Sequence, residues 1–339
     1  MKLGIFGTGA IMPVALTAMQ AVPAIIKKAI FARPHSLERG KALADHYAIE
    51  TVYTDARRML QEADISTVYI ALTNAVHYAY AKMALLAGKH VILEKPFCPH
   101  LAETKALAEL ARNRHLYLLE AMPLWHSPVY EKIQSLLSKI GPIRLVQCNY
   151  SQYSSRYDKY LSHEVLPAFD PAQFGGALYD LNVYPIAFTT GLFGRPKAVQ
   201  YTCHKGWNGV DTSGVLLLRY PGFEAVLSAA KDSESPSFMM VQGENGWLQV
   251  PGKPIFMEKM QWAFTKDVSH DQFSLGQGQN KLPVQTYQAV HEANRMTAEF
   301  REYAQIIDGG DKDTAEKFLT MTLIASEVLD EAAQYLAKP

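Results

Sequence analysis

The 339-residue chain has only three cysteines, Cys98, Cys148 and Cys203, and they are scattered. So sparse a set excludes the disulfide framework of a small secreted domain and fits a reducing compartment. The 11 histidines include no HxxxH group, and the cysteines form no CxxC pair. We therefore expect neither a structural nor a catalytic metal.

The chain also lacks long apolar runs and an excess of one charge. No apolar run approaches the ~20 residues of a membrane span. The first residues lead directly into a strand and a glycine loop, which leaves no room for a signal peptide. Lys+Arg and Asp+Glu number 33 each, so no net charge draws the molecule to nucleic acid or to an acidic membrane. We expect a cytoplasmic protein that binds a small polar molecule.

The first ~120 residues alternate short apolar strands with helices. Strands are expected at residues 2–6, 25–32, 51–53, 67–72, 90–93 and 116–120. Ser36, Asp55 and Asn74 are the expected N-caps of the intervening helices. Regular alternation implies right-handed crossovers and a doubly wound parallel sheet. Residues 1–122 are therefore predicted to form an α/β Rossmann domain.

The pattern changes after about residue 125. Longer alternating segments at 143–153, 215–220 and 225–229 are joined by Pro-Gly and Glu-Asn-Gly turns, which predicts antiparallel strands. Helices are expected at 176–191, 294–308 and 313–337. We predict that residues 123–339 form an α+β domain around a second, larger antiparallel sheet.

A glycine loop follows the first strand. Gly7 would make the tight turn, and Gly9 would let the backbone approach a pyrophosphate at the amino end of the next helix. Ala10 and Ile11 complete the loop, and Met12 stands where the full fingerprint has a third glycine or alanine. Because the loop lies between a strand and a helix, we predict a dinucleotide site here.

The end of the second strand bears on the choice of dinucleotide. A carboxylate there would bind the ribose hydroxyls of NAD, but residues 32–36 contain none. Arg33 can pair with a 2′-phosphate and stack on adenine, with Ser36 beside it; an ordinary surface charge is the alternative for Arg33. We favour NADP over NAD as the cofactor.

A lysine stands at the end of an apolar strand, in Glu94-Lys95-Pro96. The carboxyl ends of strands in open α/β sheets are where ligands bind. A buried ammonium costs several kcal/mol unless a charged or hydrogen-bonding partner compensates for it. A cofactor or substrate would be such a partner, and the alternative is a lysine that simply reaches solvent.

The Gly7/Gly9 loop, Glu94-Lys95-Pro96 and the segment GGALYDLNVY at 175–184 occur in this order, and together they resemble the Gfo/Idh/MocA oxidoreductases. The chain is most similar to the dihydrodiol and xylose dehydrogenase branch, in which tyrosine occupies the last motif position. The resemblance implies an NAD(P)-binding domain and an open sheet that joins subunits into a dimer or tetramer. It also implies catalytic and cofactor-binding residues: Lys95, Asp180 and Tyr184 beside the nicotinamide, and Thr73, Asn74, His77 and Glu94 in the cofactor segments.

Two positions depart from the family pattern. Asn182 stands where glycine is usual, and Trp125 stands where an arginine is common. The loss of that charge could change what the pocket accepts, so the resemblance does not fix the substrate.

Asp180 and Tyr184 are four residues apart in the predicted helix, so both should project from one face. Oxidation of an alcohol needs removal of a proton, and reduction of a carbonyl needs delivery of one. A lysine ammonium ~4 Å from a phenol contributes about 4 kcal/mol at an effective dielectric near 20, enough to bring a tyrosine toward neutral pH. We expect Tyr184 to be the general acid/base, assisted by Lys95 and oriented by Asp180. Lys95 as the proton donor is an equal alternative.

The segment 150–184 contains eight tyrosine and phenylalanine side chains. They could stack on sugar rings, with Arg156 or Asp158 as hydroxyl partners, or they could simply pack in strands. We predict an NAD(P)-dependent dehydrogenase or reductase that acts on a sugar, a polyol or a cyclic diol. A non-catalytic NAD(P)-binding sensor is the alternative, and an enzyme that keeps its cofactor bound between two half-reactions is a third possibility.

Overall fold

The computed structural model describes residues 1–265, 283–290 and 292–337. Its internal contacts define two compact units. The first comprises Met1–Pro123, Ala172–Phe174 and Glu292–Asp330, and the second comprises Leu124–Pro171, Gly175–His291 and Glu331–Pro339. We predicted that all of 123–339 belongs to the second domain. The contacts instead join Glu292–Asp330 to the first unit.

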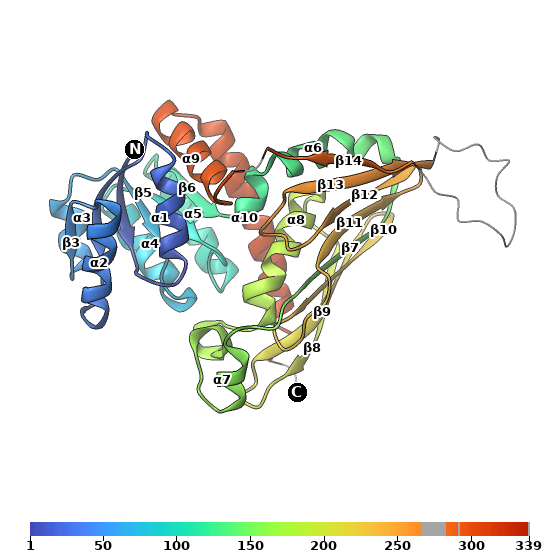
Figure 1. The fold of residues 1–339 in the computed structure, drawn as a ribbon, viewed down its shortest axis with the longest axis horizontal. Coiled ribbons are helices and arrows are strands. Elements are labelled where there is room, and N and C mark those ends of the chain that lie inside the picture. Colours follow the sequence, from blue (N-terminus) through green and yellow to red (C-terminus); the bar gives the residue numbers. More distant parts are fainter. Residues whose placement is uncertain (266–282, 291, 338–339) are drawn as a thin grey trace, which may run out of the picture. The chain divides into compact units, whose positions relative to one another are not determined.

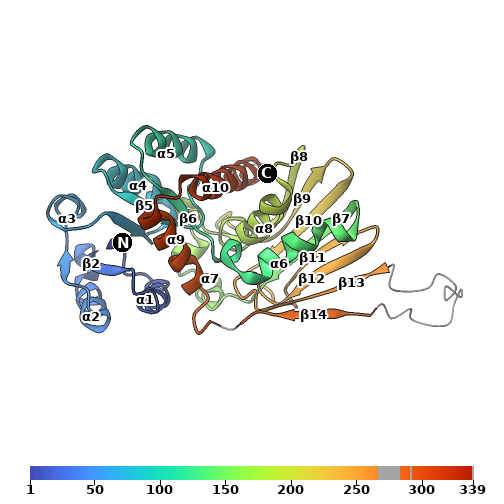
Figure 2. The same ribbon diagram turned by 90° about the horizontal axis from the view of Figure 1, so that it is seen from above.

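The first unit contains a six-stranded sheet in the order β3-β2-β1-β4-β5-β6, and every pair is parallel. This is the strand order of the dinucleotide-binding doubly wound fold. The interiors of β4 and β5 are fully buried because helices cover both faces, as Figure 2 shows. The strands are β1 (Lys2–Phe6), β2 (Ile26–Phe31), β3 (Thr51–Tyr53), β4 (Thr67–Ile70), β5 (His90–Glu94) and β6 (Leu118–Ala121).

Seven helices of the described chain belong to this unit. They are α1 (Met12–Gln20), α2 (Leu37–Tyr47), α3 (Ala56–Glu62), α4 (His77–Leu86), α5 (Leu101–Asn113), α9 (Thr297–Gly309) and α10 (Lys312–Ala333). The last two come from the end of the chain. The Asn294 amide donates to Val14 O in α1, and Leu319 of α10 joins the core around Leu107. These contacts explain why α9 and α10 belong with the Rossmann sheet.

The predicted N-caps have three different outcomes. The Asp55 carboxylate accepts the backbone N–H groups of Arg57 and Arg58 at 2.8 and 3.0 Å, so the predicted cap is confirmed. Ser36 stands at the N-cap position of α2, as predicted, but its hydroxyl makes no capping bond and donates to Arg33 O instead. Asn74 begins a 3₁₀ turn, Asn74–Val76, and α4 starts only at His77.

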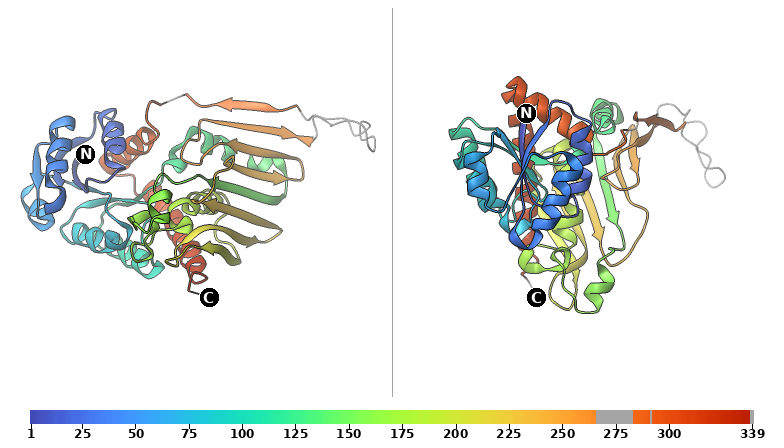
Figure 3. Two further views of the ribbon diagram at one scale, coloured as in Figure 1. Left: turned by 60° about the horizontal axis from the view of Figure 1, so that its bottom comes forward. Right: turned by 60° about the vertical axis from the view of Figure 1, so that its left-hand side comes forward.

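The second unit contains an eight-stranded sheet in the order β14-β13-β12-β11-β7-β10-β9-β8 (Figures 1 and 3). The β7–β10 pair is parallel, which makes the sheet mixed, and the other pairs are antiparallel as predicted. Alternation of apolar residues predicts a strand but not the direction of its partner. The strands are β7 (Ile143–Ser151), β8 (Ala198–Lys205), β9 (Asp211–Tyr220), β10 (Phe223–Ala230), β11 (Phe238–Gly243), β12 (Gly246–Pro251), β13 (Lys259–Phe264) and β14 (Gln285–Gln288).

The helix predicted at 176–191 consists of two parts. Residues Leu178–Asn182 form a turn of π-helix, and α8 (Val183–Phe193) continues from it. Single π turns inside helices are often found at functional sites. Helix α8 packs on β7 and β10, and α6 (Pro128–Leu136) and the short α7 (Tyr157–Leu161) complete this unit.

The described residues include no helix that is both long and apolar enough to cross a membrane. Within the same residues, no three His, Cys, Asp or Glu side chains are grouped so that they could hold a metal ion.

Candidate active site

The glycine loop lies at the carboxyl end of β1. Gly7 has φ +119°, and a Cβ at this position would lie 2.3 Å from Ala71 O, so only glycine fits. Gly9 is exposed, with open space where a Cβ would be. No side chain caps the amino end of α1 at Ile11. The loop and the amino end of α1 leave room for a pyrophosphate, and the cofactor-binding roles of Gly7, Gly9, Ala10 and Ile11 stay predictions.

Arg33 and Ser36 follow β2. The Arg33 side chain is exposed, and the Ser36 hydroxyl donates to Arg33 O at 3.1 Å. Residues 32–36 contain no carboxylate, so a guanidinium is the charged group that this strand end offers to a nucleotide.

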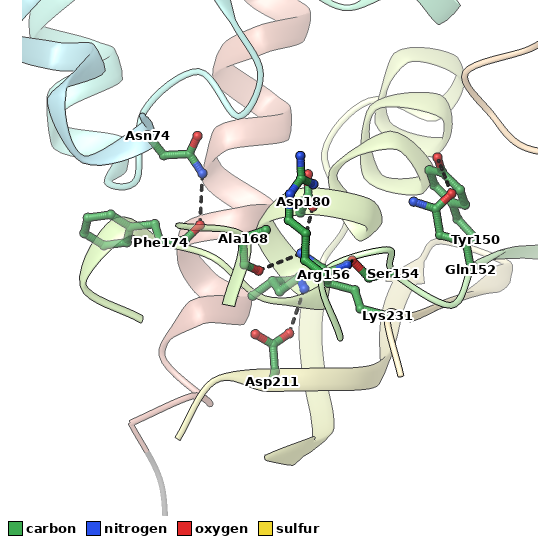
Figure 4. Close-up of polar contacts among 11 residues, drawn as sticks. Asn74, Tyr150, Gln152, Ser154, Arg156, Ala168, Phe174, Asp180, Asp211 and Lys231 are labelled. Atoms are coloured by element: carbon green, nitrogen blue, oxygen red, sulfur yellow. Dashed lines mark hydrogen bonds and ion pairs between the residues drawn. The ribbon is translucent and has the colours of Figure 1, made fainter. Parts of the chain in front are cut away.

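The segment after β4 contributes Thr73, Asn74 and His77. The Asn74 amide donates to Phe174 O at 3.0 Å (Figure 4), and Thr73 is half-buried. His77 is fully buried, and its ring nitrogens lie 3.0–3.2 Å from three backbone carbonyls, those of Leu72, Pro96 and Phe97. Burial lowers the pKa of His77. In this position His77 holds the backbone that follows Lys95.

Lys95 follows β5 and is half-buried. The preceding Glu94 is buried: its carboxylate accepts the Tyr69 hydroxyl at 2.6 Å and the Lys95 N–H at 3.2 Å. Burial raises the pKa of Glu94. Glu94 and His77 therefore fix the backbone on both sides of Lys95, whose peptide bond to Pro96 is cis. Because β1, β4 and β5 are parallel neighbours, the glycine loop, Asn74 and Lys95 follow strands that end at one edge of the sheet.

In the second unit, the glycine pair precedes the π turn. Gly176 has φ +108°. The Asp211 carboxylate, at the start of β9, is fully buried (Figure 4). It accepts the Leu178 N–H and the Tyr201 hydroxyl, each at 2.7 Å. Burial raises the pKa of Asp211 to about 6. Asp211 thus binds the first amide of the turn that carries Asp180.

Asp180 forms an ion pair that the sequence did not predict. Its carboxylate lies 2.7 Å from the ammonium of Lys231, the residue after β10. The Lys231 side chain is only 2% exposed, and that of Asp180 is 35% exposed. A lysine directly after an apolar strand was the available signal, the same one that singled out Lys95.

Tyr184 lies in the first turn of α8 and is 6% exposed. Its ring packs edge to face against Tyr150 with centroids 5.8 Å apart. A π turn precedes Tyr184, so the spacing from Asp180 is not that of a plain α-helix.

Both departures from the family pattern are core residues. Asn182 is fully buried, and its amide donates to Leu227 O at 3.4 Å. The Trp125 indole N–H donates to Ala187 O in α8 at 3.0 Å. These positions therefore anchor the helix that carries Tyr184.

Several aromatic residues of the 150–184 segment pack on one another. Tyr160 stacks on Phe169 at 4.9 Å and on Trp207 at 5.2 Å. The Tyr153 hydroxyl donates to Asp158 at 2.6 Å. Ordinary packing thus accounts for these rings, and Asp158 already has a partner.

The first unit is a Rossmann domain with a dinucleotide loop, which defines an NAD(P)-binding protein. Comparison with known proteins assigns the chain to a family within this class. Residues 1–121 match the model described as "Oxidoreductase family, NAD-binding Rossmann fold", and residues 130–249 match "GFO/IDH/MocA C-terminal domain". The chain belongs to the Gfo/Idh/MocA oxidoreductases, which confirms the predicted family, enzyme class and NAD(P) cofactor.

Among its relatives is the scyllo-inositol 2-dehydrogenase (NADP(+)) IolU of Bacillus subtilis, 37% identical over 66% of this chain and 67% of that protein. Trans-1,2-dihydrobenzene-1,2-diol dehydrogenase of Xenopus tropicalis is 29% identical over 74% and 75%. Among solved structures, KijD10, a 3-ketoreductase from Actinomadura kijaniata, in complex with NADP and TDP-benzene, has a TM-score of 0.81 at 21% identity and covers 98% of this chain and 97% of its own. The similarity to the KijD10 structure supports the fold of this chain.

Proposed function

We propose that the chain transfers a hydride between NADP and a CH–OH carbon of a sugar, polyol or cyclic diol. When bound, the nicotinamide ring accepts or donates the hydride. The observation that carries the proposal is the position of Lys95, which follows the buried strand β5 at the sheet edge where β1 ends in the glycine loop. Asp180 and Tyr184 on the second unit supply the remaining groups that handle a proton.

The protein's own residues would move the hydroxyl proton. During oxidation, Tyr184 takes this proton and Lys95 stabilises the negative charge that develops on the substrate oxygen. Asp180 accepts a hydrogen bond from a substrate hydroxyl or from Lys95. In reduction the same groups act in the reverse direction. The alternative, with Lys95 as the donor, uses the same three residues.

The side chains near Asp180 favour a polyhydroxylated ring. Tyr150 and Tyr184 form an aromatic pair that can lie against the apolar face of a ring. Gln152 and the exposed Arg156 provide polar groups for hydroxyls in the same part of the unit (Figure 4). The names of the relatives, an inositol dehydrogenase and a dihydrodiol dehydrogenase, support the same substrate class.

NADP is the proposed cofactor because Arg33 is exposed where NAD-specific proteins have a carboxylate. The NADP(+) in the name of the Bacillus relative agrees. We also propose a cytoplasmic homo-oligomer, a dimer or tetramer joined through the second sheet. Leu217 of β9 is 41% exposed, and Met240 and Trp247 are half-buried on their strands.

Purified protein tests this function directly. With NADP, we expect a change in nicotinamide absorbance with at least one cyclic polyol, aldose or dihydrodiol, and slower turnover with NAD. The K95M variant should bind the nucleotide but turn over the substrate much more slowly than wild type. Tight nucleotide binding without turnover of any substrate would favour the sensor. A nucleotide that copurifies and resists dialysis would favour the enzyme that keeps its cofactor bound.

A further inference from the structure

The Lys231 ammonium is held out of water by three groups of its own unit. It donates to Asp180 Oδ2 and to Ala168 O, each at 2.7 Å (Figure 4). It also lies 4.7 Å from the centroid of the Phe169 ring. A carboxylate, a carbonyl and a ring face thus surround the cation.

The Lys231 backbone is fixed as well. Its N–H donates to Thr212 O at 2.8 Å, and its carbonyl accepts the Ser154 N–H at 2.9 Å. Lys231 therefore connects the start of β9 with the segment after β7. Through Ala168 it also holds the far end of residues 154–171, the segment that includes Arg156.

Stability alone is a weak reason for such a pair. Desolvation of two ions offsets much of their attraction, and apolar replacements of buried pairs are often neutral. The clearest consequence of the contact is geometric and electrostatic: it fixes one carboxylate oxygen of Asp180 and keeps a positive charge beside it. Two further charged groups near this contact are Asp211, fully buried in β9, and Arg156, whose side chain extends toward Asp180 in the view of Figure 4.

We propose that Lys231 is a positioning residue that keeps Asp180 ionised and oriented, and that holds the Ala168–Phe169 segment against it to form the floor of the substrate site. This inference rests on the proposed function for the role of Asp180. Lys231 acts through Asp180 and takes no proton itself.

A double-mutant cycle of K231M and D180N tests the proposal, because methionine keeps the length of lysine and asparagine keeps the shape of aspartate. We expect K231M to lower kcat/KM for the polyol or diol by about 50-fold and to leave the NADP Kd within about twofold. In the D180N background, K231M should lower kcat/KM by less than about threefold. In the K231M single variant, the acidic limb of the plot of kcat/KM against pH should move to higher pH, because the Asp180 carboxylate without its cation is protonated more readily.

The same four proteins are also compared by denaturant unfolding, which needs no substrate. We expect the two substitutions to be coupled by more than about tenfold in the folding equilibrium constant. The exposed pair Lys159–Glu164, with a similar separation of 2.8 Å, is the matched control. The K159M/E164Q cycle should show less than about threefold coupling and an unchanged pH profile.

The outcomes distinguish the two levels of proposal. If the wild type turns over no substrate, the proposed function fails, and the unfolding cycle alone decides whether Lys231 holds Asp180. Absence of coupling in unfolding overturns the inference. The inference is also overturned if the two substitutions are coupled in unfolding but their losses in kcat/KM simply multiply. In that case the proposed function still stands.

Discussion

Asp211 Oδ1 occupies the space that a side chain at Gly176 would need. A Cβ on Gly176 would lie 1.9 Å from this atom, and the glycine has φ +108°. Asp211 cannot turn away freely because its other oxygen binds Leu178 N and the Tyr201 hydroxyl. The second glycine of the motif therefore lets a buried carboxylate reach the π turn that carries Asp180.

We predict that G176A lowers the free energy of unfolding by about 2 to 3 kcal/mol, because it adds a steric clash to an unfavourable backbone angle. Activity should fall as well, since the π turn would move. Denaturant unfolding measures the first effect. Gly209 is the matched control: it has φ +85°, but no atom lies within 4 Å of the place that a methyl group would take. G209A should cost only about 1 kcal/mol, and equal losses for the two variants would contradict the clash.

Glu120 on β6 gives a prediction about pH. It is 4% exposed, and burial, assisted by Glu94, raises its pKa from 4.5 to about 8. Between these values the folded protein keeps a proton that the unfolded chain releases, so stability falls as the pH rises. We expect E120Q, which cannot ionise, to be stabilised relative to wild type as the pH rises from about 5 to about 9, by up to a few kcal/mol.

Urea unfolding at several pH values measures this difference. E109Q, on the exposed side of α5, removes a carboxylate without a change in the core and serves as the control. If the stability difference between E120Q and wild type is the same at every pH, Glu120 does not carry a proton in the folded state.

Arg33 should distinguish the two nucleotides. R33A removes the exposed guanidinium after β2, and we expect the Kd for NADP to rise about 10- to 50-fold, since a charge-assisted contact to phosphate is lost. The Kd for NAD should change by less than about threefold. Fluorescence titration with each reduced nucleotide gives both values. R57A, on the exposed face of α3, controls for the loss of one positive charge. If R33A weakens the binding of NADP and NAD equally, Arg33 has no role in recognition of the 2′-phosphate.

Local signals predicted the first unit well. An apolar run followed by Lys95, a glycine loop between strand and helix, and the Asp55 cap each depend on neighbouring residues, and each was identified. Ser36 stands at the predicted N-cap position, but its hydroxyl donates to the Arg33 carbonyl and therefore makes no capping bond. The sequence alone could not show that α9 and α10 complete the Rossmann unit.

The partners of the candidate site residues were also beyond prediction. Lys231 lies 51 positions from Asp180, and Asp211 lies 33 positions from Leu178. Only the pairing of β9 and β10, with β7 as the parallel neighbour of β10, places these groups beside the π turn. The separation of Lys95 and Tyr184 on different units leaves their cooperation as a prediction for experiment.

Two variants should separate the roles of Lys95 and Tyr184. If Tyr184 transfers the proton, Y184F lowers kcat by about 10²- to 10⁴-fold at every pH. K95M should retain a slow reaction, and its rate should rise to a plateau at higher pH than in wild type, because a phenol without a neighbouring cation ionises less readily. If Lys95 is the donor, Y184F instead keeps the wild-type pH dependence of kcat, and K95M loses this pH dependence.

Kinetics from about pH 6 to about pH 10, with saturating NADP, give these profiles. Y130F is the control for loss of a buried phenol, because the Tyr130 hydroxyl on α6 has no hydrogen-bond partner among the residues that the structure describes. Its kcat should stay within about twofold of wild type. If Y184F and Y130F both behave like wild type, the proton does not pass through Tyr184, and the acid/base role falls to Lys95.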